Sequence, residues 1–308
     1  MKTIIVNHVS TISLFLIITL TSCGTTDPED NTNYSNKILF TSSRSGKEQL
    51  YMMNPDGSDI KQITSGEYWH NSGRWSPDAK KIVCNTEEGT TTAWVQMAIM
   101  NADGSDRKLL GYGSQMSWHP DGSIILFTYC PSCEIGIFNM KLYSIDSGGN
   151  ERVIVSEDFA GETAFSPEGD QVAFVFSDAS DTIPSPRIII MNYPTFSNTK
   201  PIGPEGAVSP FWSPNGNEIT FSKREIRTEP NDNIYIMNTD GSNIRRITNN
   251  TSNMPYIYPR WSPDGEKIIF LSYTVDGTQK WYLYMVNNDG TDLHKIIDDD
   301  TVTSCDWS

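Results

Sequence analysis

The sequence predicts an all-β protein, a six-bladed β-propeller made of four-stranded antiparallel blades. Three observations predict it. A motif anchored on a large aromatic residue recurs along the chain, each repeat holds short segments rich in β-branched and aromatic residues, and the first strands of the chain complement the incomplete last repeat. Radially repeated sheets have these features, and no segment of the sequence shows the periodicity of a helix.

The repeat is defined by its anchor residue and by the turn that follows it, which is Ser-Pro-Asp-Gly or a close variant. The copies read GRWSPDAKKIVC, MSWHPDGSIILF, TAFSPEGDQVAF, PFWSPNGNEITF, PRWSPDGEKIIF and a truncated CDWS. The anchors lie 43 to 49 residues apart and are Trp75, Trp118, Phe165, Trp212, Trp261 and Trp307. A period of this length that holds four strands is typical of a propeller blade.

Each repeat predicts four strands joined by characteristic turns. The first strand ends in the Ser-Pro-Asp-Gly turn, in which Pro sets φ and Gly accepts a positive φ. The second strand follows at once, as at 267–270, and the third, as at 234–238, runs into an Asn-x-Asp-Gly turn before a short fourth strand. An isolated Asp-Gly pair lacks the ligand spacing of a calcium loop. These pairs therefore indicate turns rather than calcium sites.

The two chain ends predict how the ring closes. The last repeat stops after its first strand at Asp306-Trp307-Ser308, whereas residues 37–42, 49–54 and 60–64 match the second, third and fourth strands of a repeat. Pairing the C-terminal strand with these three completes the sixth blade and leaves no unpaired edge within the ring. We therefore expect the propeller to cover residues 37–308.

These motifs resemble those of a known family. WSPDG followed by KIIF, then IYIMNTDGS and RRIT, is similar to the propeller repeat of TolB and related periplasmic proteins. The same repeat forms the propeller of some prolyl oligopeptidase-type peptidases. The resemblance covers essentially the whole chain after residue 36 and implies a fold rather than one function. TolB carries an α/β domain before its propeller, which residues 1–36 are too few to encode, so we expect a TolB-like lipoprotein without that domain.

The N-terminal residues predict export and lipid anchoring. Residues 1–22 contain Lys2, a short apolar run and Leu-Thr-Ser directly before Cys23, which is the layout of a lipoprotein signal peptide. We expect cleavage before Cys23, lipidation of its thiol, and a flexible polar tether over residues 23–36. The alternative is an ordinary signal peptide followed by a chance cysteine.

The residues after Cys23 bear on the destination of the protein. Gly24 in place of Asp resembles the outer-membrane sorting signal of enteric bacteria, and Asp27, Glu29 and Asp30 resemble the surface-export tags of some Bacteroidetes lipoproteins. We therefore expect an outer-membrane lipoprotein of the cell envelope that faces either the periplasm or the cell surface.

Charge and cysteine content narrow the classes of function. The net charge of −15 argues against a nucleic-acid partner, which would require a basic patch. The pair Cys130 and Cys133 has the spacing of a redox motif but no strand-helix-strand context, so a structural disulfide or two free thiols is the favoured interpretation over redox chemistry.

Candidate binding residues gather on one face of the predicted propeller. Connections from the second to the third strand and from the fourth strand to the next blade share a face, and these are the variable ones. Variable loops on a rigid frame commonly bind partners, and aromatic and arginine side chains suit that role. The candidates are Tyr68, Trp69, His70, Phe159, Arg224, Arg227, Tyr256, Tyr258 and Tyr273. Glu229 belongs to the same set of loops. The alternative is that these side chains only pack their own loops, and the run Asp298-Asp299-Asp300 is interpreted as a solvated loop rather than a cation site.

The sequence favours a binding module over an enzyme. It contains no G-x-S-x-G motif, and its histidines are too scattered to predict a metal centre, so we expect neither a catalytic residue, a metal nor a cofactor. The hypothesis is a monomeric, lipid-anchored envelope protein that holds an envelope protein or glycan on its variable-loop face. The alternative is a hydrolase or lyase that acts on polysaccharide or peptidoglycan through a carboxylate pair. A purely structural envelope component is the third reading.

Overall fold

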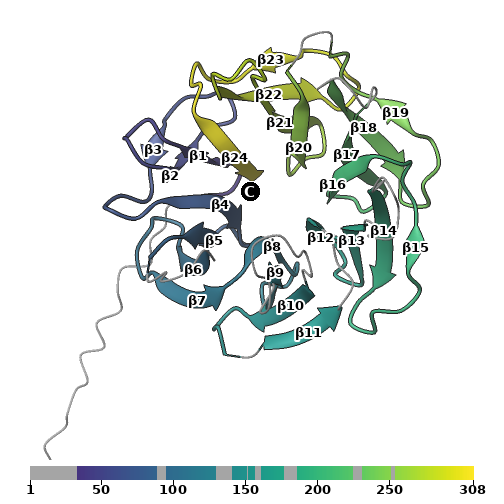
Figure 1. The fold of residues 1–308 in the computed structure, drawn as a ribbon, viewed down its shortest axis with the longest axis horizontal. Coiled ribbons are helices and arrows are strands. Elements are labelled where there is room, and N and C mark those ends of the chain that lie inside the picture. Colours follow the sequence, from purple (N-terminus) through teal and green to yellow (C-terminus); the bar gives the residue numbers. More distant parts are fainter. Residues whose placement is uncertain are drawn as a thin grey trace, which may run out of the picture. The chain divides into compact units, whose positions relative to one another are not determined.

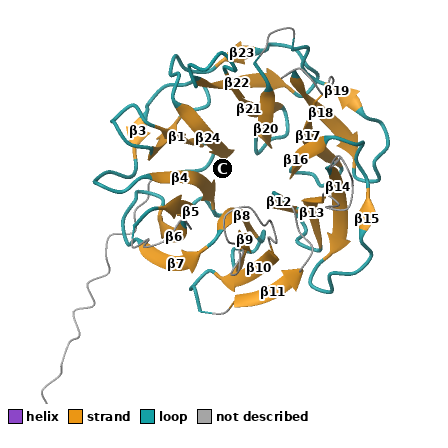
Figure 2. Cartoon of the chain, viewed as in Figure 1, coloured by secondary structure: helices purple, strands orange, loops and turns teal. Residues whose placement is uncertain are grey.

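The computed structural model describes residues 33–88, 95–129, 141–150, 152–156, 161–176, 186–224, 231–250 and 254–308. In this part of the chain, six four-stranded sheets stand around a central axis, as Figure 1 shows. Every regular element there is a strand, joined by turns and loops (Figure 2). The predicted six-bladed, all-β propeller is confirmed. Within these residues no helix is long and apolar enough to span a bilayer.

Five blades follow one another along the chain, and the sixth joins the two ends. Blade 1 holds β4 (His70–Trp75), β5 (Lys81–Thr86), β6 (Gln96–Asn101) and β7 (Lys108–Tyr112). Blade 2 holds β8 (Ser114–Trp118), β9 (Ile124–Tyr129), β10 (Lys141–Asp146) and β11 (Arg152–Ser156). Blade 3 holds β12 (Thr163–Phe165), β13 (Gln171–Phe176), β14 (Arg187–Asn192) and β15 (Lys200–Pro201). Blade 4 holds β16 (Ala207–Trp212), β17 (Glu218–Arg224), β18 (Asp232–Asn238) and β19 (Arg245–Arg246). Blade 5 holds β20 (Tyr256–Trp261), β21 (Lys267–Tyr273), β22 (Trp281–Asn287) and β23 (His294–Lys295). The closing blade holds β24 (Val302–Trp307), β1 (Ile38–Ser42), β2 (Gln49–Met53) and β3 (Lys61–Gln62).

The closing blade forms by the predicted exchange between the chain ends. β24 pairs antiparallel with β1, so that Trp307 lies opposite Ile38 and Cys305 opposite Phe40. The amide of Asn36 donates to the carbonyl of Ser308 at 2.8 Å. Because β24 occupies the inner edge that β1 would otherwise expose, every blade has four strands.

The propeller begins slightly earlier than the sequence predicted. Tyr34 and Asn36 were assigned to the tether, but Tyr34 is only 7% exposed and its ring packs beside Trp75 with 6.3 Å between centroids. The Ser308 hydroxyl donates to the Tyr34 carbonyl, and the Trp307 indole donates to Asn36 Oδ1. Burial of this aromatic ring holds residues 34–36 against the closing blade. Residues 1–32, which contain the predicted signal peptide, Cys23 and most of the tether, lie outside the described residues.

The Ser-Pro-Asp-Gly segments form the predicted turns, and blade 5 shows how. Ser262 Oγ donates to Asp264 Oδ1 and accepts from the amide of Lys267, while Asp264 Oδ1 accepts from the amide of Glu266. Gly265 has a φ of +73°. Since the aspartate oxygen is used by its own turn, the motif is architectural.

The Asn-x-Asp-Gly turns have a second purpose, which is to let neighbouring blades approach closely. Gly104 and Gly241 have positive φ, and a Cβ at these positions would lie 2.3 Å from the Ile63 carbonyl oxygen and 2.2 Å from the Ile202 carbonyl oxygen. Each of these carbonyls belongs to the preceding blade. Glycine is therefore required there for space as well as for conformation.

The hydrophobic core lies within and between the blades. Phe40, Phe127, Phe221 and Phe270 occupy the same place in their second strands and are fully buried. Each stacks on the tyrosine opposite it in the third strand, with centroids 5.5 to 5.8 Å apart. Such cross-strand aromatic pairs stabilise a sheet. The result is a rigid frame whose innermost strands surround the axis.

Candidate functional site

The innermost strands surround a cavity of about 700 Å³ on the propeller axis. In each blade, the residue immediately before the anchor residue of the repeat lines this cavity. Successive side chains of a strand point in opposite directions, so this side chain points away from the blade interface. This inner ring consists of Arg74, Ser117, Ala164, Phe211, Arg260 and Asp306. The six strands that contribute these side chains, β4, β8, β12, β16, β20 and β24, face the centre of the ring in Figure 1.

A second ring, closer to the variable-loop face, comes from the third residue before each anchor. It consists of Ser72, Gln115, Glu162, Ser209, Tyr258 and Ser304. Four of these, Ser72, Gln115, Ser209 and Tyr258, have φ between +53° and +57°, and the strand register shifts beside each of them. A β-bulge with a left-handed residue re-aims the side chains around it, at a cost of about 1–3 kcal/mol for a residue other than glycine. The repetition of this strained feature marks the channel as a candidate site.

One side of the inner ring carries three charged groups in a row, because Asp306 lies between Arg74 and Arg260 on adjacent strands. Arg260 Nε is 3.8 Å from Asp306 Oδ1, and Asp306 Oδ2 accepts from the amide of Trp75 at 2.8 Å. Arg74 Nη1 donates to the carbonyls of Gly73 and Cys305. The Arg260 guanidinium also lies over the ring of Phe211, 4.7 Å from its centroid. We call Arg260, Asp306 and Arg74 the charged arc.

Burial perturbs the ionisable groups of the channel. It lowers the pKa of Arg260 to about 10, and Arg74 beside it acts in the same direction. It raises the pKa of Tyr258 to about 12, with the Glu162 carboxylate also raising it. Burial likewise raises the pKa of Glu162 and of Asp306, although the two arginines oppose this in both cases. Perturbed groups gathered in a cavity are typical of functional sites.

Five enclosed polar atoms of the residues that line the channel have no hydrogen-bond partner: Trp75 Nε1, Glu162 Oε2, Thr163 Oγ1, Arg260 Nε and Trp261 Nε1. Two of them, Arg260 Nε and Glu162 Oε2, belong to ionisable side chains. Buried polar atoms are nearly always satisfied, because leaving one unpaired costs about 1–3 kcal/mol. An unpartnered donor and an unpartnered acceptor on residues that line one cavity suit a site that a ligand completes.

The structure brings one predicted binding residue, Tyr258, into this cavity. Tyr68 is 42% exposed in the loop before β4, on the variable-loop face, and the backbone amide of Trp69 donates to Glu87 Oε1. Tyr273 ends β21 on the same face and stacks on Trp281, with 4.6 Å between ring centroids. These three therefore lie on the predicted face but outside the cavity.

His70 and Tyr256 are integrated into the blades. His70 is fully buried, and its Nε2 lies 2.8 Å from Arg107 Nη1. Burial lowers the pKa of His70 to about 4, and Arg107 acts in the same direction. Tyr256 packs against Phe270 and Tyr284. The expectation that the His70 side chain lies on an accessible surface is corrected, because the first residue of β4 turns into the protein.

The remaining predicted binding residues cannot be placed in the site. Phe159, Arg227 and Glu229 lie outside the described residues. Arg224 is the last residue of β17, and only its backbone is described.

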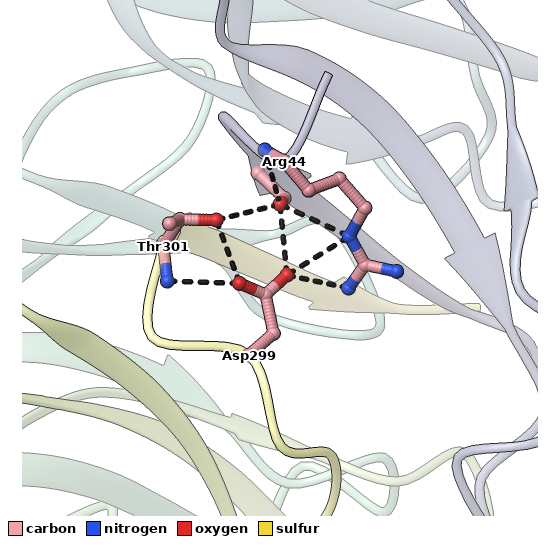
Figure 3. Close-up of polar contacts among 4 residues, drawn as sticks. Arg44, Asp299 and Thr301 are labelled. Atoms are coloured by element: carbon pink, nitrogen blue, oxygen red, sulfur yellow. Dashed lines mark hydrogen bonds and ion pairs between the residues drawn. The ribbon is translucent and has the colours of Figure 1, made fainter. Parts of the chain in front are cut away.

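Each carboxylate of the run Asp298-Asp299-Asp300 forms an ion pair with a lysine or arginine side chain of the protein. Lys295 pairs with Asp298, Arg44 with Asp299, and Lys280 with Asp300. In Figure 3, Asp299 is held between Arg44 and Thr301, whose amide and hydroxyl both donate to Asp299 Oδ1. These carboxylates are ion-paired within the fold. No group of three histidine, cysteine, aspartate or glutamate residues in the described part of the chain is arranged to hold a metal ion.

The cysteines that the structure describes are structural. Cys84 and Cys305 are buried free thiols, and burial raises the pKa of each to about 12. Cys84 occupies, in blade 1, the second-strand position that Phe40 holds in the closing blade. Cys130 and Cys133 lie outside the described residues.

The inner ring is the part of the candidate site that sequence reasoning missed. A signal for it was present, because the residue before each anchor varies among Arg, Ser, Ala, Phe and Asp while the turn after the anchor stays constant. Alternation of side chains along a strand would have placed this variable position on the axis.

Comparisons with known proteins identify the family. The model of the TolB β-propeller domain matches residues 17–152 and 138–308. The chain belongs to this family. A protein of Agrobacterium fabrum described as uncharacterized is 27% identical to this TolB-like propeller over 202 residues, which are 61% of this chain and 64% of that protein. This chain therefore matches less than two thirds of that relative.

Solved structures agree on the fold of this TolB-like propeller. TolB from Acinetobacter baumannii superposes with a TM-score of 0.71 at 20% identity, over 90% of this chain and 67% of that one. An oligogalacturonate lyase in complex with manganese superposes with a TM-score of 0.56 at 16% identity, over 84% of this chain and 73% of that one. At such identities the likeness concerns the frame rather than the chemistry of the channel.

Proposed function

We propose that this TolB-like propeller is a binding module of the cell envelope, which holds a protein or glycan partner at the variable-loop mouth of its axial channel without converting it. The observation that carries the proposal is a cavity of about 700 Å³ lined by Arg260 and Glu162, two ionisable residues that each hold an enclosed polar atom without a hydrogen-bond partner. A cavity of this size with a few convergent polar groups suits binding of a small ligand or of one segment of a larger partner.

Aromatic residues at the variable-loop face extend this proposed surface beyond the channel. Tyr68 is exposed in the loop before β4, and the half-buried, stacked pair Tyr273 and Trp281 lies at the adjoining ends of β21 and β22. Rigid aromatic side chains around a central cavity are the composition of an interface that anchors one segment deeply and contacts the rest of the partner at its rim. A partner larger than the cavity is therefore part of the proposal.

The cell envelope is the compartment consistent with TolB-like relatives, and anchoring through Cys23 is the finer proposal. A Cys23→Ala variant should remain soluble when cells are broken, whereas the unaltered chain should partition with the membranes and incorporate labelled palmitate. Equal partitioning of both proteins, with no label in either, would exclude the anchor.

A second candidate function is a carbohydrate-active enzyme, favoured by the likeness to the lyase frame and by Glu162. A carboxyl group with a raised pKa that faces Tyr258 and two arginines has the setting of a general acid. The enzyme hypothesis predicts cleavage of polygalacturonate or peptidoglycan fragments that a Glu162→Gln variant loses. The substrate and the mechanism of such an enzyme would be determined by the residues of this channel. The manganese in the similar lyase structure would not determine them.

The binding proposal is tested with the full-length chain in mild detergent. Immobilised protein is presented with envelope extracts and with a glycan array, and product formation is monitored on the same samples. We expect saturable retention of a partner without turnover, reduced by Tyr258→Ala and unchanged by Tyr282→Ala, a tyrosine of β22 outside the channel. Retention that is equal in both variants would remove the channel mouth as the site, and turnover would favour the enzyme.

A further inference from the structure

The inner ring of the channel is chemically one-sided. The charged arc, Arg260, Asp306 and Arg74, comes from blade 5, the closing blade and blade 1. The opposite half comes from blades 2 to 4 and presents Ser117, Ala164 and Phe211. Within the inner ring, a ligand therefore meets charge on one side and an apolar wall, the residues Ala164 and Phe211, on the other, where the second ring adds Gln115, Glu162 and Ser209.

The charged arc has one cationic group in excess. Its single carboxylate, Asp306, is enclosed by Arg74 and Arg260 and accepts from the amide of Trp75. Arg260 is only 5% exposed and stays protonated at neutral pH, yet its Nε has no hydrogen-bond partner. The second carboxylate near the two arginines is Glu162 of the second ring, so the two guanidinium groups leave a site for one further anion when Glu162 is protonated. Guanidinium matches a carboxylate in both charge and shape.

From this geometry we propose that the channel binds the free C-terminal carboxylate of a partner polypeptide, with Arg260 and Arg74 receiving the carboxylate and the apolar wall receiving the last side chain. The inference rests on the proposed function, since it assigns the ligand class of the same site. It also assigns a specificity: the partner should end in an apolar residue.

The apolar wall favours a peptide terminus over a sugar acid. A uronate also carries a carboxylate, but it has hydroxyl groups around its ring, and those turned toward Ala164 and Phe211 would lose water without gaining a hydrogen bond. Each such loss costs about 1–3 kcal/mol. An apolar C-terminal side chain gains contact with the same surface. A uronate oligomer is accordingly the competing outcome in the test.

Glu162, in the second ring, controls the charge of the site. The ionisable groups that face it are Arg74, Arg260 and Tyr258, and the Ser209 hydroxyl lies beside it. An ionised Glu162 repels an incoming carboxylate, whereas a protonated Glu162 can donate a hydrogen bond to it. Peptide binding should therefore strengthen as the pH falls through the raised pKa of Glu162.

The probe is a library of fluorescein-labelled hexapeptides that end in Leu, Phe or Val, each prepared as a free acid and as a C-terminal amide. Binding to the full-length chain in detergent is measured by fluorescence anisotropy at pH 5 and pH 7.5. We expect free acids to bind at least about tenfold more tightly than the matching amides, which corresponds to one charge-assisted hydrogen bond. Affinity for the acids should be higher at pH 5.

Three variants assign the effect to the channel. Arg74→Gln and Arg260→Gln should remove the preference for the free acid, while Glu162→Gln should tighten binding at pH 7.5 and abolish its dependence on pH. Arg245→Gln, on the outer strand β19, is the matched control and should change neither. If Glu162 had only a structural role, Glu162→Gln would not bind the peptides more tightly. The Glu162→Gln variant therefore still tests the inference if Arg260→Gln fails to fold.

Acids and amides that bind equally, or that both fail to bind, would overturn the inference. Binding of galacturonate trimers without binding of any peptide would overturn it in favour of a glycan. In either case the proposed function still stands if the chain retains an envelope partner in a Tyr258-dependent way. Failure of this inference can therefore be distinguished from failure of the proposed function.

Discussion

Arg44 and Asp299, which lie 255 positions apart in the sequence, form an ion pair that fastens the closing blade. Arg44 Nε donates to Asp299 Oδ2 at 3.0 Å (Figure 3). The Ser42 hydroxyl donates to the same oxygen at 2.8 Å. The Arg44 guanidinium also lies over the rings of Phe40 and Tyr51. The contact joins the end of β1 to the segment that leads into β24.

Replacing Asp299 should loosen this closure. Asp299→Ala leaves Arg44 and Ser42 without their acceptor, and we expect the free energy of unfolding in urea to fall by about 1–3 kcal/mol. The matched control is Asp298→Ala, because Asp298 is 96% exposed and pairs with Lys295 at the surface. That substitution should stay within about 0.5 kcal/mol of the unaltered protein. Equal effects of the two would show that the Asp299 contacts contribute nothing particular to closure.

His70 should make stability depend on pH in a defined window. The pKa of His70 falls from 6.5 to about 4 on folding, so the unfolded chain binds its proton first as the pH drops. The stabilisation is complete above about pH 6.5 and is lost progressively down to about pH 4, by roughly 3 kcal/mol. The window of Asp299 lies lower, since its folded pKa is below 3.8. Urea unfolding between pH 7.5 and 4 measures the slope.

A His70→Gln variant should flatten that slope, whereas His294→Gln should leave it unchanged, because His294 lies in an exposed outer strand. The prediction concerns the change in slope rather than absolute stability, since either substitution can shift the whole curve. A slope that survives in His70→Gln would assign it to other groups.

Gly241 should be far less replaceable than Gly277, although both have φ near +86°. A Cβ at Gly241 would lie 2.2 Å from the Ile202 carbonyl oxygen, whereas nothing lies within 4 Å of a Cβ at Gly277. Gly277→Ala should cost about 1 kcal/mol through its backbone conformation alone. Gly241→Ala should cost at least about 2 kcal/mol more, because two blades must separate. Melting temperatures that fall equally would contradict the close approach of the blades.

Removing residues 303–308 should open the ring. The deletion takes away most of β24, leaves β1 as an unpaired edge, and removes Trp307, whose indole donates to Asn36. We expect a markedly lower melting temperature and concentration-dependent aggregation through the free edge. Light scattering during thermal unfolding measures both, and an unchanged melting temperature would contradict the importance of the closing strand.

The fold could be predicted from the sequence because the information is redundant. Each blade repeats the anchor, the Ser-Pro-Asp-Gly turn and the strand that follows, so departures such as Phe165 or Cys84 do not obscure the pattern. Ring closure followed from the complementary ends, and the registers of Trp307 with Ile38 and Cys305 with Phe40 agree with it. Only the first residues of the propeller, from Tyr34, were misassigned, since one aromatic residue in a polar segment carries no pattern.

The site was less predictable because burial at one position depends on a local backbone conformation. Tyr256 and Tyr258 belong to the same strand and looked equivalent, yet Tyr256 packs within blade 5 while Tyr258 enters the channel. The difference arises at the bulge, where Tyr258 adopts a φ of +57°. The buried position of His70 likewise depends on a contact with Arg107, which directly precedes β7, the outermost strand of the same blade. Neither relationship is visible in composition or spacing.

The inner ring also explains how one frame can serve unrelated tasks. Each blade contributes one inner-ring and one second-ring residue to the channel from the same two registers, whereas buried residues of the second strands, such as Phe270, fix the frame. Twelve positions, two in each blade, therefore set much of the chemistry of the channel. Single substitutions at these positions could therefore change what the protein recognises, one residue at a time, without changing its fold.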